Sequence, residues 1–232
     1  VSATNKYAAF DNIVSTYSSS DTGEIVLTVT PGQLFDSIAG LNCVGITSVN
    51  VVMNDPTEGE VYNKTIAMNN EDDVIDWYSY LFTEITQSKT FAVLDMPPYA
   101  NASVTLTLTG GGAISIGVIT VGKGYDLGVT NYNTDTQLLD FSRVEEDTFG
   151  NLIIEKRPSA KLVNYSVSVK SKDKLNYVFN QINDLVGVIA LYIGEENDPK
   201  NMTTAFGIHR NVTLTKETPT LNTYTLQVRG LI

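Results

Sequence analysis

The stretch VTLTLTGGGAISIGVITVG, residues 104–122, is the part of the chain that decides its fold class. In residues 104–109 valine and leucine alternate with threonine, so apolar side chains face one way and hydroxyl groups the other. This period of two is typical of a half-buried antiparallel strand. The three glycines at 110–112 predict a turn into a second alternating strand, residues 113–122. The sequence therefore predicts a β-hairpin and, with it, a protein built from antiparallel strands.

Alternating runs of the same kind, separated by turn residues, fill most of the chain. Their apolar positions are Ile25, Leu27 and Val29; Ile46, Val49 and Val51; Val163, Tyr165, Val167 and Val169; Val212 and Leu214; and Tyr224, Leu226 and Val228. The run Val188–Ile193 is almost entirely apolar and lies between two glycines, which predicts a strand buried on both faces.

One segment, residues 171–187, has the spacing of a helix instead. Ser171 or Asp173 can cap its start, and Gly187 can close its end. We predict an amphipathic helix at about 172–186. Its apolar face consists of Leu175, Val178, Phe179, Ile182, Leu185 and Val186.

The formal net charge of −11 is confined to the first part of the chain. Residues 1–135 contain four Lys or Arg and fifteen Asp or Glu, a balance of −11, whereas residues 136–232 contain eleven of each. This asymmetry, together with the Asn/Thr-rich stretch at 130–136, indicates two domains. The fold class we expect is mainly β, with two β-sandwich-like domains at 1–128 and 129–232, the second carrying the packed helix. An acidic first half repels phosphate, and the second half has no Lys/Arg cluster, so we expect no nucleic-acid partner.

Residues that could carry chemistry are scarce. The chain has one cysteine, Cys43, and one histidine, His209, which excludes an intrachain disulfide and a conventional zinc site. Short signatures of nucleophilic, phosphate-binding and dinucleotide-binding enzymes are absent as well. We expect Cys43 to be a buried apolar side chain and His209 to be a sheet-surface or interface residue. The sequence thus predicts no catalytic residue, no metal, no cofactor and no enzymatic activity.

Paired carboxylates are the one catalytic arrangement left open, because a glycosidase needs only two acids about 5 to 10 Å apart. With 26 acidic residues such pairs arise by chance, so solvated surface charge is the favoured interpretation. The pairs considered are Glu58 with Glu60, Asp72 with Asp76, and Glu145 with Asp147.

Membrane and targeting signals are also missing from the sequence. No run approaches the roughly 20 apolar residues that cross a bilayer, so we expect no membrane span. The first ten residues have neither a basic nor an apolar targeting region. The chain begins at Val1 and not at Met, which indicates processing or a preceding segment.

An aromatic segment in the first half invites two interpretations. Acidic residues at 71–73 favour a helix start, and we predict a short helix or turn over 71–82 that packs its aromatic side chains onto the sheet. The alternative is glycan binding, because aromatic rings stack on the apolar faces of sugars. The candidate glycan contacts are Trp77, Tyr78 and Tyr80.

A second hairpin is predicted around Phe149 and Gly150, with Gly150 in the turn. Its arms are too charged to be buried inside a small domain, and an isolated two-stranded ribbon is marginal in water. We therefore expect a subunit interface, and we expect charge reversal of Arg143 with Arg157 to weaken assembly. The candidate interface residues are Arg143, Glu145, Glu146, Asp147, Phe149 and Arg157.

The order of several stretches resembles a largely uncharacterised family of virion proteins of tailed bacteriophages, whose members are encoded among tail genes. The resemblance covers essentially the whole chain. The stretches are KYAAFDN (6–12), DWYSYLF (76–82), VLDMPPY (93–99), VGKGYDLGVTNY (121–132), DFSRVEEDTFGN (140–151) and LQVRGLI (226–232).

This resemblance implies both a fold and a role. The first half is similar to discoidin-like, galactose-binding β-sandwiches, and the second half to tail-tube and distal-tail domains, which carry one packed helix and a long hairpin. The implied role is a structural component of the phage tail end (baseplate, tail tip or fibre attachment), located in the virion. The implied partners are other phage tail proteins and further copies of the chain in a threefold or sixfold ring. The alternative role is a module that binds a glycan of the host surface.

Overall fold

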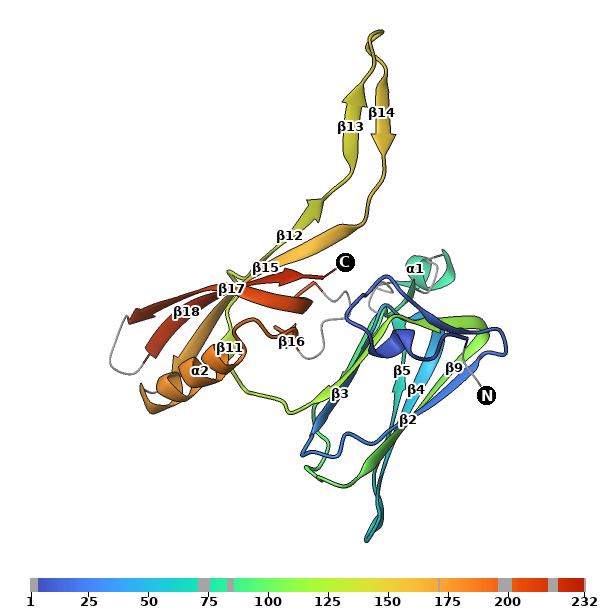
Figure 1. Ribbon diagram of the computed structural model, residues 1–232, viewed down its shortest axis with the longest axis vertical. Helices are drawn as coiled ribbons and strands as arrows, with labels where there is room; N and C mark the ends of the chain where they lie inside the picture. Colours follow the sequence, from blue (N-terminus) through green and yellow to red (C-terminus); the bar gives the residue numbers. More distant parts are fainter. Residues whose placement is uncertain are drawn as a thin grey trace. The chain divides into compact units, whose positions relative to one another are not determined.

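The structure of the protein is a computed structural model that describes residues 4–70, 76–82, 86–170, 172–195, 202–216 and 221–231. Strands make up 57% of the described residues and α-helices 9%, which confirms the predicted mainly β, sandwich-like class. The chain forms two compact units, which we call unit 1 (Val1–Gly124) and unit 2 (Tyr125–Asp198 with Met202–Ile232). The division falls close to the boundary expected at 128 (Figure 1).

Unit 1 is built mainly from two antiparallel sheets. Its elements are η1 (Ala8–Phe10), β1 (Ser18–Ser20), β2 (Glu24–Val29), β3 (Ser37–Leu41), β4 (Val44–Asp55), β5 (Gly59–Ala67), β6 (Asn69–Asn70), α1 (Trp77–Phe82), β7 (Thr86–Gln87), β8 (Thr90–Val93), β9 (Ser103–Ile116) and β10 (Val118–Gly122). The larger sheet has the order β1-β9-β4-β5, with β2 also paired to β9, and the smaller sheet has the order β10-β3-β8. β6 and β7 form a separate pair.

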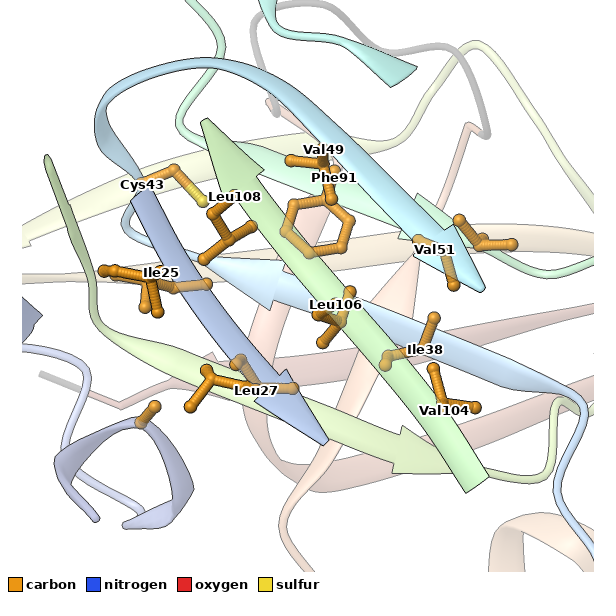
Figure 2. Packing of buried hydrophobic residues seen from close by; sticks show 14 of the residues in the cluster. Ile25, Leu27, Ile38, Cys43, Val49, Val51, Phe91, Val104, Leu106 and Leu108 are labelled. Atoms are coloured by element: carbon orange, nitrogen blue, oxygen red, sulfur yellow. The ribbon is translucent and has the colours of Figure 1, made fainter. Parts of the chain in front are cut away.

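The core of unit 1 joins residues from both sheets, as Figure 2 shows. Leu106 and Leu108 of β9 are fully buried beside Ile25 of β2. Ile38 of β3 and Phe91 of β8 enter the same cluster from the smaller sheet. Each such side chain contributes roughly 1.5–3 kcal/mol when fully buried. The alternation that the sequence shows in 104–109 therefore has the predicted cause, a strand with one face in the core.

The glycines at 110–112 do not form the predicted turn. β9 continues through them as one strand, and β1 and β2 pair with different parts of it. At Gly110 a Cβ atom would approach the carbonyl oxygen of Gly45 to well under 3.0 Å. The register between β4 and β9 also shifts on either side of Ile46. Glycine is required here for a close backbone approach at a bulge and not for a chain reversal, so the prediction of a hairpin was wrong.

Unit 2 is an antiparallel sheet covered on one face by a helix. Its elements are β11 (Val129–Thr130), β12 (Asp135–Asp140), β13 (Arg143–Glu146), β14 (Leu152–Glu155), β15 (Ser159–Lys170), α2 (Lys172–Asp184), β16 (Ala190–Ile193), β17 (Thr204–Lys216) and β18 (Leu221–Gly230). The sheet order is β11-β15-β18-β17-β16, with β12 also paired to β15. β13 and β14 form a two-stranded ribbon of their own.

Helix α2 confirms the helix predicted at about 172–186. Leu175, Val178 and Ile182 are buried and belong to the same cluster as residues of β15 and β18, so the helix takes the place that a second sheet has in unit 1. Phe179 and Val186 remain 50% and 65% exposed. The apolar face of the helix is thus wider than the surface that the sheet covers.

Strand β16 differs from its prediction. The run 188–193 was expected to be buried on both faces, but β16 is the edge strand of its sheet and Tyr192 is its one buried residue. Val188 lies before the strand and is 47% exposed. An apolar run of this length does not distinguish a central strand from an edge strand that follows a helix.

The start of unit 2 is fixed to the body of the unit by polar contacts. Lys174 of α2 lies 2.6 Å from a carboxylate oxygen of Asp126, and this hydrogen bond lowers the pKa of Asp126. The hydroxyl group of Tyr224 donates a 2.8 Å hydrogen bond to the carbonyl oxygen of Leu127. Residues 125–128 therefore belong to unit 2.

Candidate functional site

The β13–β14 ribbon forms the hairpin that the sequence predicts around Gly150. Four residue pairs connect its strands, from Arg143 opposite Glu155 to Glu146 opposite Leu152, and every residue of both strands is exposed. Figure 1 shows the ribbon standing beyond the ends of β12 and β15, away from the sheet of unit 2. It is a regular element with no core of its own.

One face of the ribbon is mainly apolar, and Glu146, opposite Leu152, is its one charged residue. Residues that are opposite each other in an antiparallel pair lie on the same face. Val144 is opposite Ile154, and Leu152 lies two residues before Ile154, so these three side chains share a face. Val144 is 59% exposed, Ile154 65% and Leu152 66%. We call these three residues the apolar face of the ribbon.

The other face is charged, and its charges pair with each other. Arg143 forms an ion pair with Glu145, and the Arg157 guanidinium lies 3.1 Å from Glu155. All four side chains are about half exposed, so each pair contributes little to stability. The arginines that sequence analysis assigned to a subunit contact thus already have partners within the ribbon.

The tip of the ribbon is an ordered turn centred on Asp147. One carboxylate oxygen of Asp147 accepts hydrogen bonds from the backbone N–H groups of Phe149 (2.8 Å) and Asn151 (2.9 Å), and the other accepts from the Asn151 side chain (2.9 Å). The hydrogen bond from the Asn151 side chain and those from the backbone lower the pKa of Asp147. Gly150 adopts a positive φ of 82°, which suits glycine. This turn presents Phe149 with 87% of its surface exposed.

The base of the ribbon is attached to the sheet. The backbone N–H of Arg157 donates to the Ser142 hydroxyl at 3.2 Å, which joins the two arms. The Arg229 guanidinium of β18 lies 5.7 Å from the centre of the Phe141 ring, within the range of a cation–π contact. The ribbon therefore extends from a fixed base.

A second exposed group lies on α1 in unit 1. Trp77, Tyr78 and Tyr80 are 82%, 72% and 66% exposed, so the expected packing of these aromatics onto the sheet was wrong. Trp77 and Tyr80 make an edge-to-face contact with ring centres 6.0 Å apart. The ring centres of Tyr78 and Phe82 are 4.8 Å apart. Residues 71–75, which the predicted helix also included, lie outside the described residues.

Two of the carboxylates considered for a catalytic pair have hydrogen-bond partners of their own. Glu58 accepts a 2.5 Å hydrogen bond from the Tyr99 hydroxyl, which raises the pKa of Tyr99. Asp147 is engaged in the ribbon turn. Asp72 lies outside the described residues. A similar tyrosine–carboxylate contact joins Tyr62 to Asp95 at 2.7 Å and lowers the pKa of Asp95.

The cysteine and the histidine are both buried. Cys43 is 3% exposed, as expected, and burial raises its pKa to about 12, so the thiol is neither ionised nor accessible. His209 is 8% exposed. It was expected on the sheet surface or at an interface, and the first of these two locations was wrong. Its Nδ1 atom lies 3.0 Å from the Tyr192 hydroxyl, and burial lowers its pKa. Within the described residues no three His, Cys, Asp or Glu side chains are grouped to hold a metal ion.

Comparisons with known proteins return no match. No protein-family model, no curated protein and no solved structure matches this chain. Among the described residues no helix is long and apolar enough to cross a membrane. The hairpin and its charges were predicted from the sequence, but its apolar face was not, because that face depends on the register that pairs Val144 with Ile154.

Proposed function

We propose that this chain is a structural subunit that assembles with copies of itself and with other proteins at the tail end of a tailed bacteriophage, within the virion. The observation that carries the assembly is the β13–β14 ribbon, whose eight residues are all exposed. A two-stranded ribbon is marginally stable in water unless another surface covers it. Its apolar face, the ordered tip and the exposed Phe149 support a role in binding another protein.

The phage assignment is supported by the order of sequence stretches that resemble a tail protein family. The architecture agrees with what that resemblance implies, because unit 2 combines a β-sheet, one packed helix and a long hairpin. The stretch 140–151, one of those that carry the resemblance, forms the tip and one arm of the ribbon. Ring-forming homo-oligomers are common among such structural parts.

The proposal is tested by measuring oligomeric state and virion content. We expect light scattering of the purified chain to show oligomers whose mass is a small integer multiple of 25.3 kDa. We also expect peptides of the chain in mass spectra of purified virions from the phage that encodes it. A chain that stays monomeric at high concentration and is missing from virions would remove this function.

The second candidate function is glycan binding by unit 1, and the exposed aromatics of α1 favour it. Aromatic rings held open to solvent can stack on sugar rings, and Trp77 is the most exposed of the three candidates. A glycan array with the full chain tests this function. We expect Trp77→Ala to abolish any signal, whereas Phe149→Ala, an exposed aromatic of the other unit, leaves it unchanged; equal loss in both variants would contradict a site on α1.

A further inference from the structure

The apolar face of the ribbon lies out of reach of its own helix. The ribbon continues from the Ser159 end of β15, whereas α2 begins just beyond the Lys170 end of that strand. A strand of twelve residues is roughly 40 Å long. In Figure 1 the ribbon points away from the sheet and α2 lies near the far end of β15. If a helix α2 covers the apolar face of the ribbon, that helix must therefore belong to another copy of the chain.

Unit 2 also carries an apolar surface that could receive such a ribbon. Phe179 and Val186 are seven residues apart and so lie along one line of the helix and its continuation. The N–H of Val186 bonds to the carbonyl oxygen of Asn183 at 3.2 Å, which extends the helical turn beyond Asp184. Both apolar side chains are at least half exposed. We call Phe179 and Val186 the open margin of α2.

The charges beside these two surfaces are opposite. Residues 145–147 at the ribbon tip are Glu, Glu and Asp, and even with the ion pair to Arg143 two negative charges remain. By sequence, residues 170–174 at the start of α2 contain three lysines and one aspartate, a formal charge of +2, and the structure pairs Lys174 with Asp126. Complementary charges of this kind favour one docking orientation over others.

We propose that the ribbon of one copy docks its apolar face on the open margin of α2 of a second copy, with the acidic tip toward the lysines at the helix start. The two surfaces are different, so the contact is head-to-tail, and repetition of it closes into a ring or continues as a filament. This inference rests on the proposed function as a self-assembling subunit. It names the two surfaces that the assembly uses.

The test is a mixing experiment with two complementary variants of the full chain. The ribbon variant carries Val144→Ser, Leu152→Ser and Ile154→Ser, and the helix variant carries Phe179→Ser and Val186→Ser. All five positions are exposed, so both variants should retain the circular dichroism and the thermal unfolding of the unaltered chain. The matched control is Ile153→Ser, an exposed apolar residue on the charged face of the ribbon.

We expect each variant alone to be monomeric by light scattering at a concentration where the unaltered chain and the control associate. An equimolar mixture should give dimers and nothing larger, because one variant supplies an intact ribbon and the other an intact helix. We also expect association of the unaltered chain to weaken at least several-fold between about 0.1 M and 1 M salt, where charges are screened.

Other outcomes overturn the inference without ambiguity. If the helix variant alone still associates as the unaltered chain does, the ribbon binds a different surface and the inference fails, while the proposed function stands. If the mixture stays monomeric, the two surfaces are not each other's partners. Unchanged association at 1 M salt would contradict the docking of the tip at the helix start. An unaltered chain that never associates would overturn the proposed function itself.

Discussion

Two antiparallel pairs in unit 2 have similar backbones and opposite surroundings. β15 and β18 pair over nine residues, and their apolar side chains lie under α2. β13 and β14 pair over four residues, and none of their side chains is covered. Backbone pairing alone therefore does not account for a stable strand pair, because the hydrophobic contribution is missing from the second one. The sheet holds the unit together, while the ribbon is available to bind something else.

The largest effect that separates these two pairs is expected from truncating one apolar residue in each. Leu226→Ala in β18 removes a side chain that is 2% exposed, and we expect a loss of about 2–5 kcal/mol in the free energy of unfolding. Ile154→Ala in β14 removes one that is 65% exposed, and we expect a change within about 0.5 kcal/mol. Urea unfolding of the full chain measures both, and hydrogen exchange assigns the transition to unit 2. Equal losses would mean that the ribbon is covered within its own chain.

The next effect is a loss of stability in acid, caused by the buried His209 on the core side of the sheet. In the folded protein burial lowers the pKa of His209 below its ordinary value of 6.5. The unfolded chain therefore binds a proton at this residue more readily than the folded chain does. The contribution to stability is complete above about pH 6.5 and is lost progressively as the pH falls toward the lowered pKa. We expect amide exchange in β16 and β17, corrected for its intrinsic rate, to show decreasing protection between pH 7 and pH 5.

The control for this prediction is His209→Gln, which has no titrating group but retains a polar side chain beside Tyr192. In this variant the protection of β16 and β17 should vary much less over the same pH range. The ribbon contains no histidine. The pH dependence of its amide exchange should therefore be identical in the unaltered chain and the variant. A variant that loses protection as steeply as the unaltered chain would assign the acid response to other groups.

A smaller and more local effect is expected at the tip of the ribbon. Asp147→Ala removes the carboxylate that accepts hydrogen bonds from Phe149 and Asn151, so the turn should open without unfolding the sheet. Amide exchange at 149–151 should rise, while exchange in β15 and β18 stays constant. Because hydrogen bonding lowers the pKa of Asp147, its support is present above about pH 4 and fades as the pH falls below that value. Protection at 149–151 that is unaffected by the substitution would show that the turn is held by Gly150 and backbone bonds alone.

Sequence periodicity predicted the elements that have one face in a core and the other face outside it. Alternation identified β9 and β15, and three- and four-residue spacing identified α2, because each of these elements has one face in a core. The turn at Gly150 was predictable as well, since a positive φ is a local property of the chain. Periodicity succeeds where one residue and its near neighbours decide the structure.

Features set by distant residues were not predictable in this way. The glycines at 110–112 have the composition of a turn, yet the approach of Gly45 from another strand is what requires Gly110. The aromatic side chains of α1 are of a kind that often packs in a core, yet they are exposed. No sheet face of the described residues covers them. At the ribbon, charges were visible in the sequence, but the apolar face depends on the register that brings Val144 opposite Ile154.

The smallest effect is expected from reversing the arginines of the charged face, Arg143→Glu with Arg157→Glu. The sequence predicts that these residues contact another subunit, but both are paired with carboxylates of their own ribbon and remain about half exposed. Exposed ion pairs contribute little, so we expect the association constant to change by less than about fivefold. The ribbon variant that removes Val144, Leu152 and Ile154 should change it far more. Light scattering over a dilution series compares the two, and a larger effect from the arginines would place the charged face, and not the apolar one, against the neighbouring molecule.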